Sequence, residues 1–240
     1  MRLLALAVTL ALASGCQNAP PEAAAPAVPT AATPPASGAD TAPPASEATP
    51  DTLTVVFFGD SLTEGYGLAN PMAQSYPALI GEKIEAEGIP ARVVNAGNSG
   101  ETTAGGLRRA DWVLARTTPD VFMVALGGND QLRGLPPEET EKNLRAILTK
   151  VREAAPEAAL VVAGLEALPN LGADFGTAYR AAFADAAEAS GATLIPFFLE
   201  GVAGNPALNQ PDGVHPTAEG QRRMAETVWE VVGPIVRARA

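Results

Sequence analysis

The run Leu53–Phe58, LTVVFF, is followed directly by Gly59-Asp60-Ser61, GDS. A short, continuous apolar run rich in Val and Phe is typical of a strand buried on both faces, as strands of parallel sheets are. Glycine, aspartate and serine are also common turn residues, because they tolerate or hydrogen-bond tight backbone conformations. The stretch alone therefore leaves two interpretations of Ser61: a turn residue after a buried strand, or a nucleophile held at the end of that strand.

The rest of the chain alternates apolar runs with helical patterns. Four further runs predict strands: Arg92–Val94, Val121–Leu126, Leu160–Ala163 and Thr193–Ile195. Helical spacing or helix-start signals predict helices over 72–87, around 107–114, from Pro136-Pro137, over 174–189 and from Pro216. Such alternation implies crossover units and a parallel sheet covered by helices on both faces. We therefore predict an α/β fold, a three-layer α/β/α sandwich with a five-stranded, flavodoxin-like parallel sheet.

Polar segments follow three of the predicted strands and precede the last helix. They are Gly59–Ser61, Asn95–Gly100, Gly127–Asp130 and Asp212–Pro216. In open parallel sheets, ligands bind beyond the carboxyl ends of the strands. We therefore expect the hydroxyl, backbone amides, side-chain amide and carboxylate–imidazole pair of these segments to share one cleft.

Those groups suit acyl transfer to serine. The hydroxyl of Ser61 is a weak nucleophile until a base takes its proton, and imidazole suits that role because its reference pKa lies near neutrality. Asp212 precedes His215 by three residues, so one turn of chain can place it beside the ring that it must orient. The amide of Gly100 and the side-chain NH₂ of Asn129 are candidate donors to the developing oxyanion.

Each of these residues also has a structural interpretation. The single histidine can be structural, Asp212 can stabilise a turn before Pro216, and Ser61 can cap a helical turn. Asn129 can be a turn residue after two glycines. Separately these interpretations are as good as the catalytic ones. Together they would require four unrelated turns to carry a complete hydrolase set at one end of the sheet, which favours the catalytic interpretation.

The four segments, in this order, resemble the sequence blocks of the GDSL-type esterases, also called SGNH hydrolases, over essentially the whole of residues 53–240. The resemblance implies that Ser61 is the nucleophile and that Asp212 and His215 complete a catalytic triad. It also implies an oxyanion site formed by the Ser61 and Gly100 amides and the Asn129 side chain. Ser61 does not lie in a Gly-x-Ser-x-Gly elbow, which argues against an α/β-hydrolase.

Two further stretches, GGNDQLRG over Gly127–Gly134 and LIPFFL over Leu194–Leu199, look like the bacterial periplasmic arylesterase, thioesterase and lysophospholipase subgroup. That subgroup implies hydrolysis of small acyl esters and thioesters through an acyl-enzyme intermediate, without a cofactor or metal. The loop Leu165–Phe175 occupies the place of the subgroup's mobile substrate loop. Its apolar side chains either line an acyl site or pack beneath the loop: Leu165, Leu168, Leu171 and Phe175.

Residues 1–15 have the form of an export signal, with Arg2, an apolar core and small residues before Cys16. Leu12–Cys16 resembles a bacterial lipoprotein lipobox, with Ala13 where that pattern usually has Leu; plain signal cleavage is the alternative. Gln17 then resembles the sorting pattern for the outer membrane. We expect a periplasmic protein that is attached to the outer membrane through lipid on Cys16 only.

Composition separates a tether from a domain. Residues 16–52 are mostly Ala, Pro, Thr and Ser, without aromatic or basic residues, so we expect a disordered, extended tether. Residues 53–240 have the length of one hydrolase domain. One cysteine and one histidine in the chain exclude a disulfide and a multi-histidine metal site. The net charge of −11 argues against nucleic acid as a partner.

Two other functions fit the same fold. A carbohydrate O-acetylesterase would use the same chemistry on acetylated sugars. A non-catalytic envelope lipoprotein would have kept the fold without the reaction, but the intact polar set argues against it.

Overall fold

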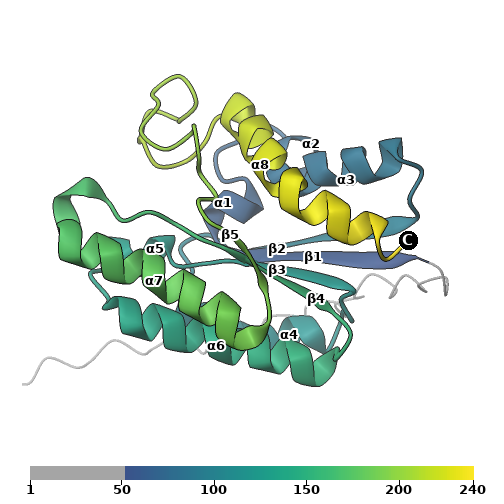
Figure 1. Cartoon of the computed structure of the whole chain (residues 1–240). Coiled ribbons are helices and arrows are strands. Elements are labelled where there is room, and N and C mark those ends of the chain that lie inside the picture. Colours follow the sequence, from purple (N-terminus) through teal and green to yellow (C-terminus); the bar gives the residue numbers. More distant parts are fainter. Residues whose placement is uncertain (1–51) are drawn as a thin grey trace, which may run out of the picture. The chain divides into compact units, whose positions relative to one another are not determined.

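The computed structural model describes residues 52–240, the coloured part of Figure 1. The predicted signal peptide over 1–15, the lipidation site Cys16 and all of the tether over 16–52 except its last residue lie outside the described residues. The described chain forms a five-stranded parallel sheet in the order β2-β1-β3-β4-β5. The strands are β1 (Leu53–Gly59), β2 (Ala91–Gly97), β3 (Val121–Ala125), β4 (Ala159–Ala163) and β5 (Thr193–Ile195). This is the flavodoxin-like order, which confirms the predicted sheet.

Helices cover both faces of the sheet, so the three-layer prediction is also confirmed. On one face α3 (Tyr76–Ala86) packs against α8 (Ala218–Arg237); on the other lie α4 (Thr103–Leu114), α6 (Pro137–Ala154) and α7 (Ala173–Ser190) (Figure 1). Shorter elements lie between them: α1 (Ser61–Glu64), α2 (Pro71–Gln74), α5 (Gly128–Leu132) and the 3₁₀ turn η1 (Pro169–Leu171). None of the helices within residues 52–240 has the length and apolar character needed to cross a membrane.

The helix predicted over 72–87 is wrong in one respect, because it is two helices. Ser75 separates α2 from α3 with an extended backbone, φ −69° and ψ 150°. The cause is Pro77 at the second position of α3, where its missing N–H is harmless. In a continuous helix the ring of Pro77 would clash with the carbonyl four residues earlier.

Two element boundaries differ from the sequence prediction, and two short helices were not predicted. Strand β2 continues to Gly97, three residues beyond the predicted end, because its whole length pairs with β1. Helix α8 begins at Ala218 rather than Pro216, since the hydroxyl of Thr217 caps it by accepting from the Gly220 N–H at 3.2 Å. The short helices α1 and α5, which directly follow β1 and β3, were not predicted.

Strand β1 lies in the middle of the core. Phe57 packs edge-on against Tyr76 of α3, with ring centroids 5.4 Å apart. The next residue, Phe58, contacts Phe122 of β3 at 5.5 Å and lies beneath the Arg109 guanidinium of α4. Consecutive side chains of β1 therefore pack against opposite helical layers, as predicted for a strand buried on both faces.

Strand β1 and its neighbour β2 both end in glycine, so no side chain projects from the sheet there. Gly59 and Gly97 are partners in the β1–β2 register, and α1 lies directly against both. A Cβ at Gly59 would approach Thr63 Oγ1 to 2.0 Å, and one at Gly97 would approach the backbone nitrogen of Glu64 to 2.2 Å. Only glycine at these two positions allows the turn after β1 to fold back onto the sheet.

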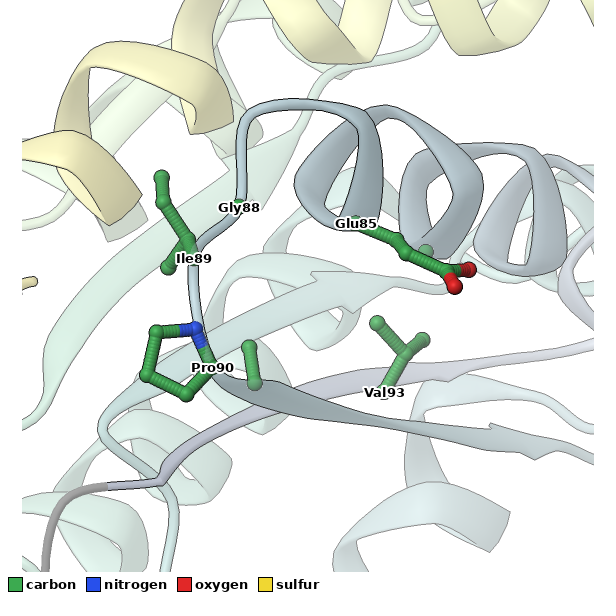
Figure 2. Close-up of a pocket in the computed structure, with 7 residues that line it drawn as sticks. Glu85, Gly88, Ile89, Pro90 and Val93 are labelled. Atoms are coloured by element: carbon green, nitrogen blue, oxygen red, sulfur yellow. The ribbon is translucent and has the colours of Figure 1, made fainter.

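A hollow of about 460 Å³ lies beside the C-terminal end of α3 and strand β2, at one edge of the sheet. Figure 2 shows Glu85, Ile89, Pro90 and Val93 around it. None of the residues predicted from the sequence to be catalytic, to bind the oxyanion or to bind substrate lines this hollow. It is therefore separate from the candidate site described below.

The close approach of α1 to the sheet predicts a contrast between two glycine substitutions. Gly97→Ala places a methyl group against backbone that cannot move away, so we expect a loss of about 2 kcal/mol or more in the free energy of unfolding. Gly81→Ala lies in the interior of α3, where a Cβ would meet Val93 Cγ2 at an ordinary 3.5 Å. It should stabilise the protein by about 0.5–1 kcal/mol through helix propensity.

Urea unfolding followed by circular dichroism measures both changes. The opposite order of stability would contradict the close packing of α1 on Gly97.

Candidate active site

The four polar segments meet at the carboxyl end of the sheet, in a cavity of about 720 Å³. Five of the predicted polar site residues line it: Ser61, Gly100, Asn129, Asp212 and His215. Of the four apolar residues predicted to bind substrate, the structure places two in the cavity. Leu165 and Leu168 line the cavity, whereas Leu171 and Phe175 are not among its lining residues. Phe175 instead stacks on Tyr179, with ring centroids 5.6 Å apart.

Ser61 is the first residue of α1 and is almost fully buried. The side chain of Asp60, not that of Ser61, caps this helix by accepting from the Leu62 N–H at 3.0 Å. The Ser61 hydroxyl is therefore left for a contact elsewhere, and its Oγ lies 3.0 Å from His215 Nε2. Its backbone N–H belongs to the first turn of a helix, where such groups have no partner within the helix.

Asp212 and His215 form a compact unit. Asp212 Oδ2 lies 2.8 Å from His215 Nδ1, while Oδ1 accepts from the backbone N–H groups of Val214 and His215 at 2.9 and 3.0 Å. The backbone bond from His215, its ring and the Val214 amide lower the pKa of Asp212 from 3.8 to about 2. Because an ionised carboxylate only accepts, Nδ1 must carry the proton. Nε2 is then the acceptor that faces Ser61.

Two residues that the sequence reasoning did not single out hold this unit in place. Gln210 donates from its backbone to the His215 carbonyl at 2.7 Å, and from its side chain to Tyr66 and Pro216 carbonyls at 2.8 and 3.0 Å. The ring of Tyr66 lies against the imidazole of His215, with centroids 4.7 Å apart. Tyr66 follows α1, so the segment of Ser61 and the segment of His215 contact each other at more than one point.

Gly100 and Asn129 lie on the other polar wall. Gly100 adopts φ 75°, a left-handed conformation that favours glycine, and its carbonyl accepts from Arg133 at 2.8 Å. The Asn129 side chain donates from Nδ2 to Asp60 Oδ2 at 3.1 Å. Since that carboxylate can only accept, it fixes which end of the amide faces it. The second N–H of Nδ2 remains available to a ligand in the cavity.

Asp60 is the buried residue that sequence reasoning missed. It was present in the quoted GDS stretch, but its burial depends on α5, which was not predicted. Burial raises the pKa of Asp60 from 3.8 to about 6, against the lowering effects of its bonds from Leu62 and Asn129 and of the charge on His215. A single carboxylate thus contacts both the helix that carries Ser61 and the amide of Asn129.

Further buried polar contacts hold the loops behind these residues. Asp130 accepts from the N–H of Thr103 at 2.9 Å and from its hydroxyl, which joins α5 to α4. Glu101 pairs with Arg109 of α4 and accepts from the side chain of Asn98 at 3.1 Å, which supports the loop of Gly100. Within residues 52–240, no group of three or more His, Cys, Asp or Glu side chains is placed to hold a metal ion.

Comparisons with known proteins identify the family. The model of the GDSL-like lipase/acylhydrolase family matches residues 57–223. The chain belongs to this family. Among GDSL-like relatives, it is 38% identical over 190 residues to esterase TesA of Pseudomonas aeruginosa, an alignment that covers 79% of this chain and 92% of TesA. It is 37% identical over 189 residues to thioesterase 1/protease 1/lysophospholipase L1 of Escherichia coli K12, which covers 79% of this chain and 86% of the relative.

Solved structures of GDSL-like hydrolases share the fold. The psychrotrophic esterase EstA from Pseudoalteromonas sp., in a structure inhibited by monoethylphosphonate, superimposes with a TM-score of 0.71 at 30% identity. The match covers 77% of this chain and 98% of EstA. The resemblance stated from the sequence, to GDSL-type esterases of the arylesterase and thioesterase subgroup, is therefore confirmed.

The buried carboxylate predicts a pH-dependent effect of Asp60→Asn. The raised pKa means that the folded state binds the Asp60 proton more tightly, so the contribution of Asp60 to wild-type stability falls as the pH rises from about 4 to about 6 and then stays low. Because one pKa unit corresponds to about 1.4 kcal/mol, a rise from 3.8 to about 6 amounts to roughly 3 kcal/mol. Asp60→Asn removes this loss, so its stability relative to wild type should increase between pH 4.5 and pH 7.5.

Denaturant unfolding of both proteins at the two pH values measures this change. A stability difference that does not vary with pH would contradict the burial of an ionised Asp60. The same variant should have a lower kcat at pH 7.5, because an amide at position 60 no longer dictates which end of the Asn129 amide faces it.

Proposed function

We propose that this protein is a serine esterase that hydrolyses acyl esters through an acyl-enzyme intermediate. The observation that carries the proposal is the continuous hydrogen-bonded row from Asp212 through His215 to Ser61, with distances of 2.8 and 3.0 Å. Membership of the GDSL-like lipase/acylhydrolase family supports it. The nucleophile, the base and the orienting carboxylate are then Ser61, His215 and Asp212.

In the first step, His215 Nε2 takes the Ser61 proton as Oγ attacks the ester carbonyl. The backbone amides of Ser61 and Gly100 and the free N–H of Asn129 hold the oxyanion, each such donor being worth roughly 3–4 kcal/mol in comparable sites. The imidazolium then gives its proton to the leaving alcohol or thiol. Asp212 stabilises that imidazolium and remains ionised throughout.

In the second step, water attacks the acyl-enzyme while His215 again acts as base. The new carboxylic acid leaves and the Ser61 hydroxyl is restored. Asp60 stays outside the proton transfers; it keeps Asn129 oriented and places a negative charge near the imidazolium. Apart from the attacking water, the mechanism uses only side chains and backbone amides of this chain and requires no cofactor.

The cavity favours substrates with an apolar acyl or aryl group. Beyond the polar residues its wall is largely apolar, with Leu62, Leu132, Leu165, Leu168, Phe197 and Leu199. Its volume of about 720 Å³ lies in the range of small-molecule sites. The relatives named as an esterase, an arylesterase and a thioesterase/lysophospholipase support aryl esters, lysophospholipids and acyl thioesters as the substrate classes.

The location of the protein is part of the proposal. The signal-like residues 1–15, with Cys16 directly after them, support export to the periplasm and lipid attachment to the outer membrane. A tether over 16–52 would then separate the lipid from the hydrolase domain of residues 53–240.

Ser61→Ala tests the nucleophile. It removes the attacking oxygen but leaves the fold, so turnover of p-nitrophenyl butyrate should fall by about 10⁴-fold or more. Covalent labelling by a fluorophosphonate probe should disappear in the variant and be present in wild type. Retained turnover with an unchanged circular dichroism spectrum would remove Ser61 from the mechanism.

A parallel assay separates the esterase from the carbohydrate O-acetylesterase. Wild-type protein should hydrolyse p-nitrophenyl butyrate and octanoate faster than acetylated xylan. Release of acetate from the polysaccharide as the dominant activity would overturn the proposed substrate class while leaving the triad in place.

Cys16→Ser tests the lipid attachment. Each buried CH₂ of an acyl chain contributes about 0.8 kcal/mol to membrane binding, so loss of the acylated residue should release the enzyme. In a bacterial host with an outer membrane, the variant should move from the membrane fraction to the soluble periplasmic fraction and lose palmitate labelling. Wild-type protein found soluble and unlabelled would contradict lipidation and favour plain signal cleavage.

A further inference from the structure

One stretch of the cavity wall makes few hydrogen bonds to the rest of the fold. This wall loop, residues 165–171, joins β4 to α7 and contains η1. Four of its apolar residues line the cavity: Leu165, Ala167, Leu168 and Pro169. The loop is anchored at its start, where Gly164 donates to the Ile195 carbonyl and accepts from the Phe198 N–H at 2.8 and 2.9 Å.

Beyond Gly164, the backbone of the wall loop is held by one side chain. Gln131 of α5 donates from Nε2 to the Glu166 carbonyl at 3.2 Å and accepts at Oε1 from the Leu168 N–H at 2.8 Å. Within residues 52–240, these are the hydrogen bonds that join the backbone of 165–171 to another element. Both ends of one carboxamide therefore clamp the loop at points two residues apart.

The burial of Gln131 makes this clamp effective. Its side chain is mostly buried and itself lines the cavity, so a lost partner would leave an amide or a backbone group unsatisfied. The other polar connection of the loop is the ion pair of Glu166 with Arg180 of α7 at 2.8 Å, whose side chains are 39% and 51% exposed. Such an exposed pair contributes little because water and salt screen it.

We propose that Gln131 is a positioning residue that sets the acyl-chain-length preference by holding the wall loop against α5. The proposal rests on the proposed esterase function. The acyl group of an acetate ester is a single methyl and stays beside Ser61, whereas a longer acyl chain must extend along the wall formed by Leu165 and Leu168. A wall that is fixed before binding favours the long chain, because no loop has to be ordered on association.

The test compares wild type with Gln131→Met, which has nearly the same volume but makes neither hydrogen bond. The kinetic constants are measured for p-nitrophenyl acetate, butyrate, octanoate and dodecanoate. We expect kcat/KM for octanoate to fall about tenfold, mainly through KM, since two buried hydrogen bonds are lost. For acetate kcat/KM should stay within about twofold of wild type.

Two further variants sharpen the result. Gln131→Glu keeps the acceptor for the Leu168 N–H but cannot donate to the Glu166 carbonyl, so its chain-length profile should lie between wild type and Gln131→Met. Arg180→Met is the matched control, because it breaks the exposed ion pair of the same loop without touching the clamp. Its profile should coincide with that of wild type.

The outcomes separate this inference from the function on which it rests. If wild type hydrolyses the esters and Gln131→Met lowers kcat/KM equally for all four, or for none, Gln131 does not set the preference. An Arg180→Met profile as altered as that of Gln131→Met would also overturn the assignment. Wild-type protein that hydrolyses none of the esters and is not labelled by the fluorophosphonate probe would instead overturn the esterase function itself.

Discussion

The contact on which the site depends is the close approach of α1 to bare backbone at the end of the sheet. Gly59 and Gly97 lie side by side in β1 and β2, and the four-residue helix rests on them without an intervening side chain. That contact fixes the height of Ser61 above the sheet. The segment after the carboxyl end of β3 and the segment of His215 extend to the same height above the sheet. Loops from distant parts of the chain therefore meet at the Ser61 hydroxyl.

Asp60 connects α1 to α5 across the cavity, although burying its carboxylate is unfavourable for the folded state. One oxygen caps the helix that carries Ser61 and the other accepts from Asn129, so the positions of Ser61 and of the Asn129 amide both depend on Asp60. An apolar side chain at position 60 would avoid the burial of a charge, but it would leave the Asn129 amide without the acceptor that fixes its orientation. Positions at which a protein tolerates an unfavourable environment are often those that preorganise a reaction.

The sequence was sufficient for the sheet and for the polar segments, because both are encoded locally. Continuous apolar runs such as Val121–Leu126 identify buried strands, and the rule that ligands bind beyond their carboxyl ends pointed to the segments that line one cavity. What could not be predicted depends on contacts between distant residues. The burial of Asp60, the support from Gln210 and the clamp by Gln131 appear only once α1, α5 and the loops are packed together. Likewise the sequence placed Leu165 and Phe175 in one loop, but Phe175 lies in α7 and stacks on Tyr179, whereas Leu165 lines the cavity.

The row of hydrogen bonds at the cavity also has a temporal consequence. Ser61 and His215 are 154 residues apart, and Gln221 of α8 ties the late helix to the early ones by accepting from Tyr76 and donating to the Leu62 carbonyl. The chain as far as the end of β5 contains Ser61 and all five described strands but not His215. The row of hydrogen bonds is therefore complete only when the segment of His215 and the first turns of α8 have packed against the earlier part of the domain.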